Sequence, residues 1–587
     1  MTSAAMDATL TARALGPAAD GEVWARLRTH AASIPQVEGV RAHATALRAE
    51  PISELPPSVY LEYERTGDRA HHGDLYFQRR RRLAALALSA LLDPAEDVGE
   101  LAATIEAICT EPQWALPAHL AGAATVPPGL VVDLFAAETG SALAEITTLL
   151  AGRLPEAVVA SAREHVRRRV LDSYASHTFW WEDAASNWAA VCAGSVALAA
   201  LQLCEEDRVR AMAPRLRASL RRSLDGYGDD GVCVEGFGYW NYGFGYYLLA
   251  TEALDAAIGP DPEGEAPRAA AAARWPSRAF LTGGVVVPFA DTHPTDTVSV
   301  GLVAATARRY GQVGRPDPGV ADTALIDECG RWALALHGLC RLPAALADDP
   351  FADTPERPLW YPDAQWLVIP QGSRSPIGFA ARAGDNAEPH NHNDLGSFAI
   401  ALDGEPLLGD AGRGIYDREY FGPQRYDNPA AGSHGHPVPL LDGVRQQDGA
   451  RARAEVLAAE SDGEGERLVV DLTSAYPHPA LTRLVRTVAR AGASVTVRDE
   501  VLAQAPVRLT QRHICQVRPQ VAGPGRVLVQ GERGAAELVH DPTLLVEVGA
   551  FDVGRGSFEH PVFYVDLSVA EPRVEADLVT TVHVSRV

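Results

Sequence analysis

Cysteine is scarce in this 587-residue sequence: there are seven, an odd number, and no two form a Cys-x-x-Cys pair. A scattered, odd set argues against a disulfide framework and against a thiolate zinc site, and it fits reduced thiols in a cytosolic protein. The seven are Cys109, Cys192, Cys204, Cys233, Cys329, Cys340 and Cys515.

Long hydrophobic runs are also missing. No stretch approaches about 18 apolar residues without a charged or polar interruption, so we expect no membrane span. Residues 1–8 show no basic start followed by an apolar run. We therefore see no signal peptide and expect a cytoplasmic location.

Positive charge is in deficit, with 52 Lys and Arg against 76 Asp and Glu and a net charge of −24. Phosphates attract cations, so this balance argues against a nucleic-acid or membrane-surface role. The 47% hydrophobic and 22% charged residues are typical of a folded protein. A chain of this length should form at least two domains.

The spacing of apolar residues changes near residue 345. Before that point apolar residues recur at helical spacing, as at Val159, Ala162 and Val166. After it, short alternating runs such as 494–497 and 527–529 are bounded by Gly, Asp or Pro, which is typical of an antiparallel β-sandwich. The sequence therefore predicts helical hairpins over residues 1–345 and a sandwich over residues 346–587.

Potential metal ligands gather in the segment that begins at His390. His390 and His392 are two residues apart, so they share one face of an extended segment. The Asp403-Gly404 turn predicts a hairpin that carries Asp410 back towards His392. Two more histidines, His434 and His436, follow. Three neutral or anionic ligands from three segments suit a zinc-like ion, and the pattern predicts a metal site.

Aromatic residues and glycines gather in the helical half, where residues 230–247 hold seven aromatic residues and five glycines. Flat aromatic rings stack on sugars, and glycines let a ligand approach the backbone. The competing interpretation is an aromatic seam between two helices. The Glu-Gly-x-x-Tyr-Trp arrangement at 235–240, with Asn187-Trp188 upstream, keeps a sugar-binding function open.

Motifs in both halves, in order, resemble those of the heparinase II/III-like polysaccharide lyase family. The resemblance implies an α/α toroid followed by an antiparallel β-sandwich, in agreement with the change of period. It also implies β-elimination at a uronic acid: a base removes the C5 proton, the C4–O bond breaks, and an acid protonates the leaving oxygen. The motifs are Trp114–His119, Asp133–Thr139, Asn187-Trp188, Glu235-Gly236-x-x-Tyr239-Trp240, His390-x-His392-x-Asp394-x-Gly396-Ser397-Phe398, Leu408-x-Asp410-x-Gly412, Arg425–Asp427 and His436–Gln446.

The resemblance implies a role for each matching residue. Asn187 would neutralise the uronate carboxylate, Tyr239 would protonate the leaving oxygen, and His390 would be the base or a partner in neutralisation. Tyr242 is the alternative to Tyr239. The residues expected to bind substrate are Trp188, Glu235, Trp240, Tyr242, His119, Arg413 and Arg425.

The same resemblance makes His392, Asp410 and His436 a structural metal site, expected to hold zinc. The sequence departs from the family twice. Ser186 stands where many members have an asparagine, which puts the carboxylate contacts in question, and Pro437 follows His436, which leaves His434 as an alternative ligand.

We expect a lyase that acts on an anionic oligosaccharide or polysaccharide. Its oligomeric state stays open, with a homodimer as the candidate. Two other functions stay open. One is a metal-dependent hydrolase in which the three metal ligands activate water. The other is a glycan-binding protein that has lost catalysis. Release of an unsaturated product separates the three, because hydrolysis creates no double bond.

Overall fold

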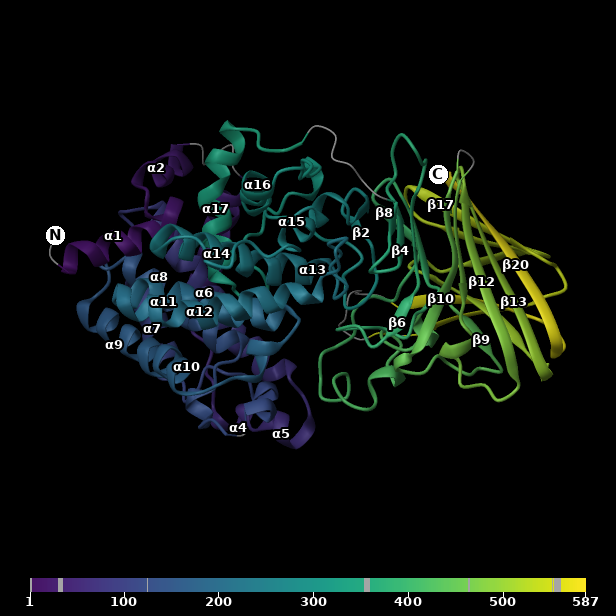
Figure 1. Ribbon diagram of the computed structural model, residues 1–587, viewed down its shortest axis with the longest axis horizontal. Helices are drawn as coiled ribbons and strands as arrows, with labels where there is room; N and C mark the ends of the chain where they lie inside the picture. Colours follow the sequence, from purple (N-terminus) through teal and green to yellow (C-terminus); the bar gives the residue numbers. More distant parts are fainter. Residues whose placement is uncertain are drawn as a thin grey trace.

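Helices form the first half of the protein and strands the second (Figure 1). The computed structural model describes residues 3–29, 35–123, 125–352, 359–462, 465–551, 553 and 561–587. The predicted fold class, an α/α toroid followed by an antiparallel β-sandwich, is confirmed. The last helix ends at Ala347 and the next strand begins at Trp360; the domain boundary at residue 345 stays a prediction.

Helix α11 (Asn187–Leu203) lies at the centre of the helical half. Almost all its residues are buried. The helix is apolar on nearly all sides, and a helix of this kind is stable only when other elements pack against it from all sides. Helices α8, α12 and α14 pack against it. In the described part of the chain, no helix is long and apolar enough to cross a membrane. The other helices are α1 (Ser3–Leu15), α2 (Gly21–Thr29), α3 (Pro35–Ala49), α4 (Pro57–Tyr60), α5 (Glu62–Thr66), α6 (Ala70–Leu92), α7 (Gly99–Cys109), α8 (Leu134–Leu149), α9 (Glu156–Val166), α10 (Asp172–Ser176), α12 (Glu206–Ser223), α13 (Phe237–Tyr239), α14 (Gly245–Ile258), α15 (Ala269–Ala272), α16 (Val300–Tyr310) and α17 (Trp332–Ala347).

Two sheets make the sandwich. One has the strand order β15-β16-β17-β20-β13-β12-β11-β10-β6, and the other β18-β19-β14-β8-β7-β5-β4-β3 with β9 beside β14. Each pairing between these strands is antiparallel. The strands are β3 (Trp360–Tyr361), β4 (Trp366–Ile369), β5 (Gly378–Arg382), β6 (Gly384–Asn386), β7 (Phe398–Leu402), β8 (Glu405–Leu408), β9 (Pro439–Leu441), β10 (Gly449–Ser461), β11 (Glu466–Asp471), β12 (Leu481–Ala491), β13 (Ser494–Val507), β14 (Leu509–Cys515), β15 (Gln520–Gly523), β16 (Arg526–Gln530), β17 (Gly534–His540), β18 (Leu545–Phe551), β19 (Val562–Ser568) and β20 (Arg573–Arg586).

The sheet that contains β4, β5 and β7 is the middle layer of the molecule. Along β7, Phe398 and Ile400 join the core between the two sheets, while Ala399 and Ala401 join the core of the helical half. Side chains alternate along a strand, so both faces of β7 are buried and its sequence is apolar throughout. The sheet with β12, β13 and β20 lies on the far side from the helices (Figure 1).

One stretch of the helical half is not helical, although the sequence predicted helices almost throughout residues 20–345. Strand β1 (Phe280–Thr282) pairs with β2 (Val285–Val286), and residues 287–299 follow with no helix or strand. The Gln371 backbone N–H donates to the Leu281 carbonyl (2.8 Å), which ties this hairpin to the sandwich. The stretch therefore brings Asp291 to the boundary between the two halves.

Candidate active site and metal centre

Three side chains from three segments of the sandwich converge at the predicted metal site. Potential ligand atoms of His392, Asp410 and His436 all lie within 4.8 Å of one another. Asp410 Oδ2 is 2.9 Å from His436 Nδ1 and 3.9 Å from His392 Nδ1. The side chains are at most 3% exposed, and none of these three atoms has a well-formed hydrogen bond within the described residues.

The second nitrogen of each imidazole is already in use. His392 Nε2 donates to Asp291 Oδ1 (3.0 Å), and His436 Nε2 donates to the Ala430 carbonyl (3.2 Å). With a proton on each Nε2, both Nδ1 lone pairs point towards Asp410. Two imidazole lone pairs and one carboxylate suit a zinc-like ion, and hydrogen bonds of this kind orient such ligands. The residues therefore fit the predicted metal, with His436 in the triad rather than His434.

Burial lowers the pKa of His392, but the neighbouring carboxylates of Asp291 and Asp410 outweigh burial and raise the pKa to about 9. A proton on His392 thus competes with a metal ion for the same position. Binding of the ion would release that proton.

The predicted catalytic residues meet at the boundary between the halves. The His390 ring stacks on the Tyr239 ring with centroids 4.4 Å apart. His390 Nε2 lies 3.8 Å from Glu235 Oε2, and Glu235 Oε1 accepts a hydrogen bond from the Asn187 backbone N–H (3.3 Å). His390 holds a left-handed backbone conformation (φ 56°), a strained state for a non-glycine residue that is frequent at functional sites.

A carboxylate that sequence reasoning missed joins the two sites. Asp291 Oδ2 accepts from His390 Nδ1 (2.7 Å) and from the Tyr416 hydroxyl (2.9 Å), and Asp291 Oδ1 accepts from His392 and from the Tyr420 hydroxyl (2.5 Å). Burial opposes its ionisation, but the Arg425 guanidinium and the two histidines hold the pKa of Asp291 well below its usual range. Asp291 is therefore an ionised, fully buried acceptor.

Comparison with known proteins agrees with this arrangement. Residues 353–586 match the family described as "Heparinase II/III-like, C-terminal". This match covers the sandwich half, which is thus similar to a heparinase II/III-like C-terminal domain. The resemblance predicted from the motifs is thereby confirmed. No curated protein matches the chain.

Several solved structures are similar in fold over most of the chain at low sequence identity. A heparinase III structure has a TM-score of 0.62 at 11% identity, over 88% of this chain and 77% of that one. A heparan sulfate lyase HepC from Pedobacter heparinus has a TM-score of 0.55 at 14% identity, over 89% and 77%. A chondroitin AC lyase from Streptomyces coelicolor has a TM-score of 0.51 at 14% identity, over 99% and 82%.

Tyr239 and Tyr242 point to different neighbours. The Tyr239 hydroxyl lies 2.7 Å from the Tyr416 hydroxyl of the heparinase II/III-like domain, whereas the Tyr242 hydroxyl donates to Glu138 Oε2 (2.9 Å) inside the helical half. Tyr242 lies inside a π-helical turn (Trp240–Phe244), whereas Tyr239 directly precedes this turn. Burial raises the pKa of Tyr239, so its phenol keeps its proton at neutral pH.

The remaining predicted residues divide into two sets. Arg425 donates to Asp291 (3.3 Å), and the Arg413 guanidinium lies over the Tyr416 ring, so both lie at the site. The His119 ring packs edge-on against the ring of Trp188, with centroids 4.9 Å apart. Trp188 directly follows Asn187 in the chain.

Trp240 does not lie at the site. Its side chain is 2% exposed, and its Nε1–H donates to the Ala272 carbonyl (2.8 Å). The ring stacks between Phe237 and Phe244. These are the contacts of a core residue, so the competing interpretation of an aromatic seam holds for Trp240.

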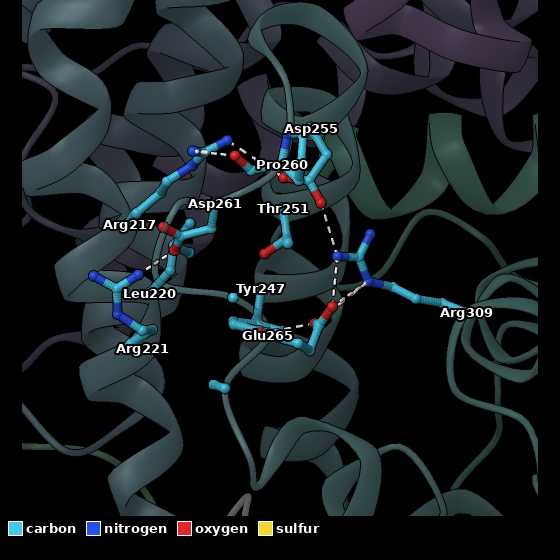
Figure 2. Close-up of a pocket in the computed structure, with 12 residues that line it drawn as sticks. Arg217, Leu220, Arg221, Tyr247, Thr251, Asp255, Pro260, Asp261, Glu265 and Arg309 are labelled. Carbon is cyan, nitrogen blue, oxygen red and sulfur yellow. Dashed lines mark hydrogen bonds and ion pairs between the residues drawn. The ribbon is translucent and has the colours of Figure 1, made fainter.

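A separate pocket opens in the helical half (Figure 2). Arg217, Asp255, Glu265 and Arg309 are among its lining residues, and none of the predicted site residues is. Arg309 pairs with Asp255 (2.8 Å) and with Glu265 (2.7 Å), and Arg217 pairs with Asp255 (3.3 Å). The charges of this pocket are thus engaged with one another.

Proposed function

We propose that the chain is a polysaccharide lyase that cleaves a uronic-acid-containing glycan by β-elimination and releases an unsaturated uronate product. The observation that carries the proposal is the stacking of His390 on Tyr239 at the boundary between the halves, with Glu235 contacting both His390 and the Asn187 backbone. Structures of similar fold belong to proteins named as lyases of heparan sulfate and chondroitin, which supports the same class of reaction.

The proton-transfer groups follow from the hydrogen bonds. Because His390 Nδ1 donates to Asp291, the His390 lone pair lies on Nε2 and accepts the C5 proton of the uronate. Tyr239 keeps its proton and donates it to the leaving oxygen. The Tyr416 hydroxyl, 2.7 Å from that of Tyr239, continues the hydrogen-bond chain to Asp291.

The substrate carboxylate needs positive charge, although the chain as a whole carries −24. Asn187 stands at the N-terminus of α11, where the helix dipole favours an anion, and its side-chain NH2 group is a donor suited to a carboxylate. Arg413 and Arg425 lie beside Tyr416 and Asp291. Together they favour the negative charge that builds up on the carboxylate during elimination.

The metal triad would hold a structural, zinc-like ion, which joins three segments of the sandwich when bound. A hydrolytic zinc needs an open position where water and substrate meet. Here the three ligand side chains are 0–3% exposed. This burial favours the lyase over a metal-dependent hydrolase.

The decisive experiment incubates the purified protein with a panel of polyuronates and sulfated glycosaminoglycans. A lyase produces an unsaturated product that absorbs ultraviolet light, a hydrolase produces new reducing ends without that absorbance, and a binding protein produces neither. Loss of the absorbance in His390→Ala, with the fold retained, assigns the reaction to this site. Cleavage without absorbance would overturn the proposal.

A further inference from the structure

Asp291, a residue of the helical half, forms hydrogen bonds with both functional histidines of the sandwich, His390 and His392. It lies in the irregular stretch after β2, and Ala290 before it has a left-handed backbone (φ 64°). Gly236 (φ 116°) packs so closely on Thr292 that an added Cβ would lie 2.2 Å from its hydroxyl. The segment that carries Asp291 is therefore held tightly against the one that carries Glu235.

Within the described residues, the Asp291 side chain accepts its hydrogen bonds from the sandwich half. They are donated by His390, His392, Tyr416, Tyr420 and Arg425. A carboxylate with this many donors is an acceptor on both oxygens. Each histidine nitrogen that faces it must carry a proton.

This requirement fixes both imidazoles at once. The proton on His392 Nε2 leaves the lone pair of that ring on Nδ1, the atom that faces Asp410. The proton on His390 Nδ1 leaves the lone pair of that ring on Nε2, the atom that faces Glu235. One carboxylate thus selects the metal-ligating atom of one histidine and the proton-accepting atom of the other.

We infer that Asp291 is a positioning residue that couples metal binding to catalysis, by holding His392 and His390 in the tautomers that each task needs. The catalytic part of this inference rests on the proposed lyase function, and the metal part does not. Asp291 acts through the two histidines, because both of its oxygens accept hydrogen bonds from protein groups.

The test is Asp291→Asn in the full-length protein. The asparagine amide keeps one acceptor oxygen and replaces the other oxygen with an NH2 group, which only donates. It can therefore accept a hydrogen bond from only one of the two histidines and favours the wrong tautomer of the other ring. We expect zinc affinity, measured by competition with a chromogenic chelator, to fall by about 10- to 100-fold. We also expect kcat to fall by about 100-fold or more with KM changed by less than about threefold.

Asp230→Asn is the matched control. Asp230 is also a carboxylate of the helical half that accepts hydrogen bonds from the sandwich, from the backbone N–H groups of Asp363 (2.9 Å) and Ala364 (3.0 Å). It contacts no histidine in the described structure. We expect zinc affinity and kcat of wild type in this variant, and equal losses in both variants would show that Asp291 merely joins the two halves.

Unchanged zinc affinity or unchanged kcat in a folded Asp291→Asn would overturn the inference. If that variant does not fold, Tyr420→Phe takes its place, because Tyr420 donates to Asp291 Oδ1, the same oxygen that accepts from His392. Zinc affinity equal to that of wild type in Tyr420→Phe would then overturn the inference. If the wild type forms no unsaturated product from any glycan, the proposed function fails, and the zinc measurement alone decides the role of Asp291.

Discussion

Removing the hydroxyl of Tyr239 should stop turnover without unfolding the protein. Tyr239→Phe keeps the ring that stacks on His390 and removes the proton that would go to the leaving oxygen. General acid catalysis contributes about 10²–10⁴-fold, so the activation free energy should rise by about 3–5 kcal/mol. Tyr416 still donates to Asp291, so the surrounding hydrogen bonds remain.

Tyr242→Phe should give the opposite pattern. It leaves the buried Glu138 carboxylate with the Tyr246 hydroxyl (2.8 Å) and the more distant Arg331 (3.7 Å) as partners. Loss of one hydrogen bond to a buried carboxylate should lower the free energy of unfolding by about 1–3 kcal/mol. Because Tyr242 lies away from His390, kcat should stay close to that of wild type.

Both variants are compared in two assays, initial rates followed by the absorbance of the unsaturated product and unfolding in denaturant. The reasoning predicts a large rate loss only for Tyr239→Phe and a large stability loss only for Tyr242→Phe. An inactive Tyr242→Phe beside an active Tyr239→Phe would assign the proton to the wrong tyrosine. Full activity in both would remove tyrosine from the elimination step.

Three further predictions concern the metal, the carboxylate contact and the sandwich core. His392→Ala should lose the bound metal, about one ion per chain in wild type by elemental analysis, and a full complement in the variant would refute the site. Asn187→Ala should lower kcat by about 10²–10³-fold in the same absorbance assay, and a wild-type rate would exclude its role. Asp499→Ala removes the ion-pair partner of the fully buried Arg486 and should lower the free energy of unfolding by about 3–5 kcal/mol. Asp577→Ala breaks the exposed pair with Arg498 and should lower it little, so similar losses in the two variants would contradict the argument.

The metal triad could be predicted because the fold brings its members together by local rules. The hairpin at Asp403-Gly404 returns Asp410, and β7 indeed pairs with β8. The expectation that His390 and His392 share one face of an extended segment is wrong, because His390 lies in a turn with a left-handed backbone and His392 precedes β7. The choice between Tyr239 and Tyr242 could not be predicted. Residues three apart share a face of an α-helix, and the π-helical turn after Tyr239 changes that relation.

Asp291 could not be predicted for a different reason. It lies in a stretch without periodic spacing, and its partners are 99 to 134 positions away along the chain. Polar residues in such a stretch usually indicate a loop. Only the docking of the sandwich against the helical half turns this aspartate into a buried acceptor, and no short-range pattern contains that information.

The one-sided contacts of Asp291 also have a consequence for the order in which the nascent chain folds. Its donors among the described residues are all translated after it, and Arg425 follows it by 134 positions. At about 5–20 residues per second, synthesis of that interval takes on the order of ten seconds. During that time the aspartate must stay in water, because an ionised carboxylate without partners is too costly to bury. The segment around Asp291 therefore takes its final place only when the emerging sandwich folds against it, and the ribosome releases helices before it releases a complete active site.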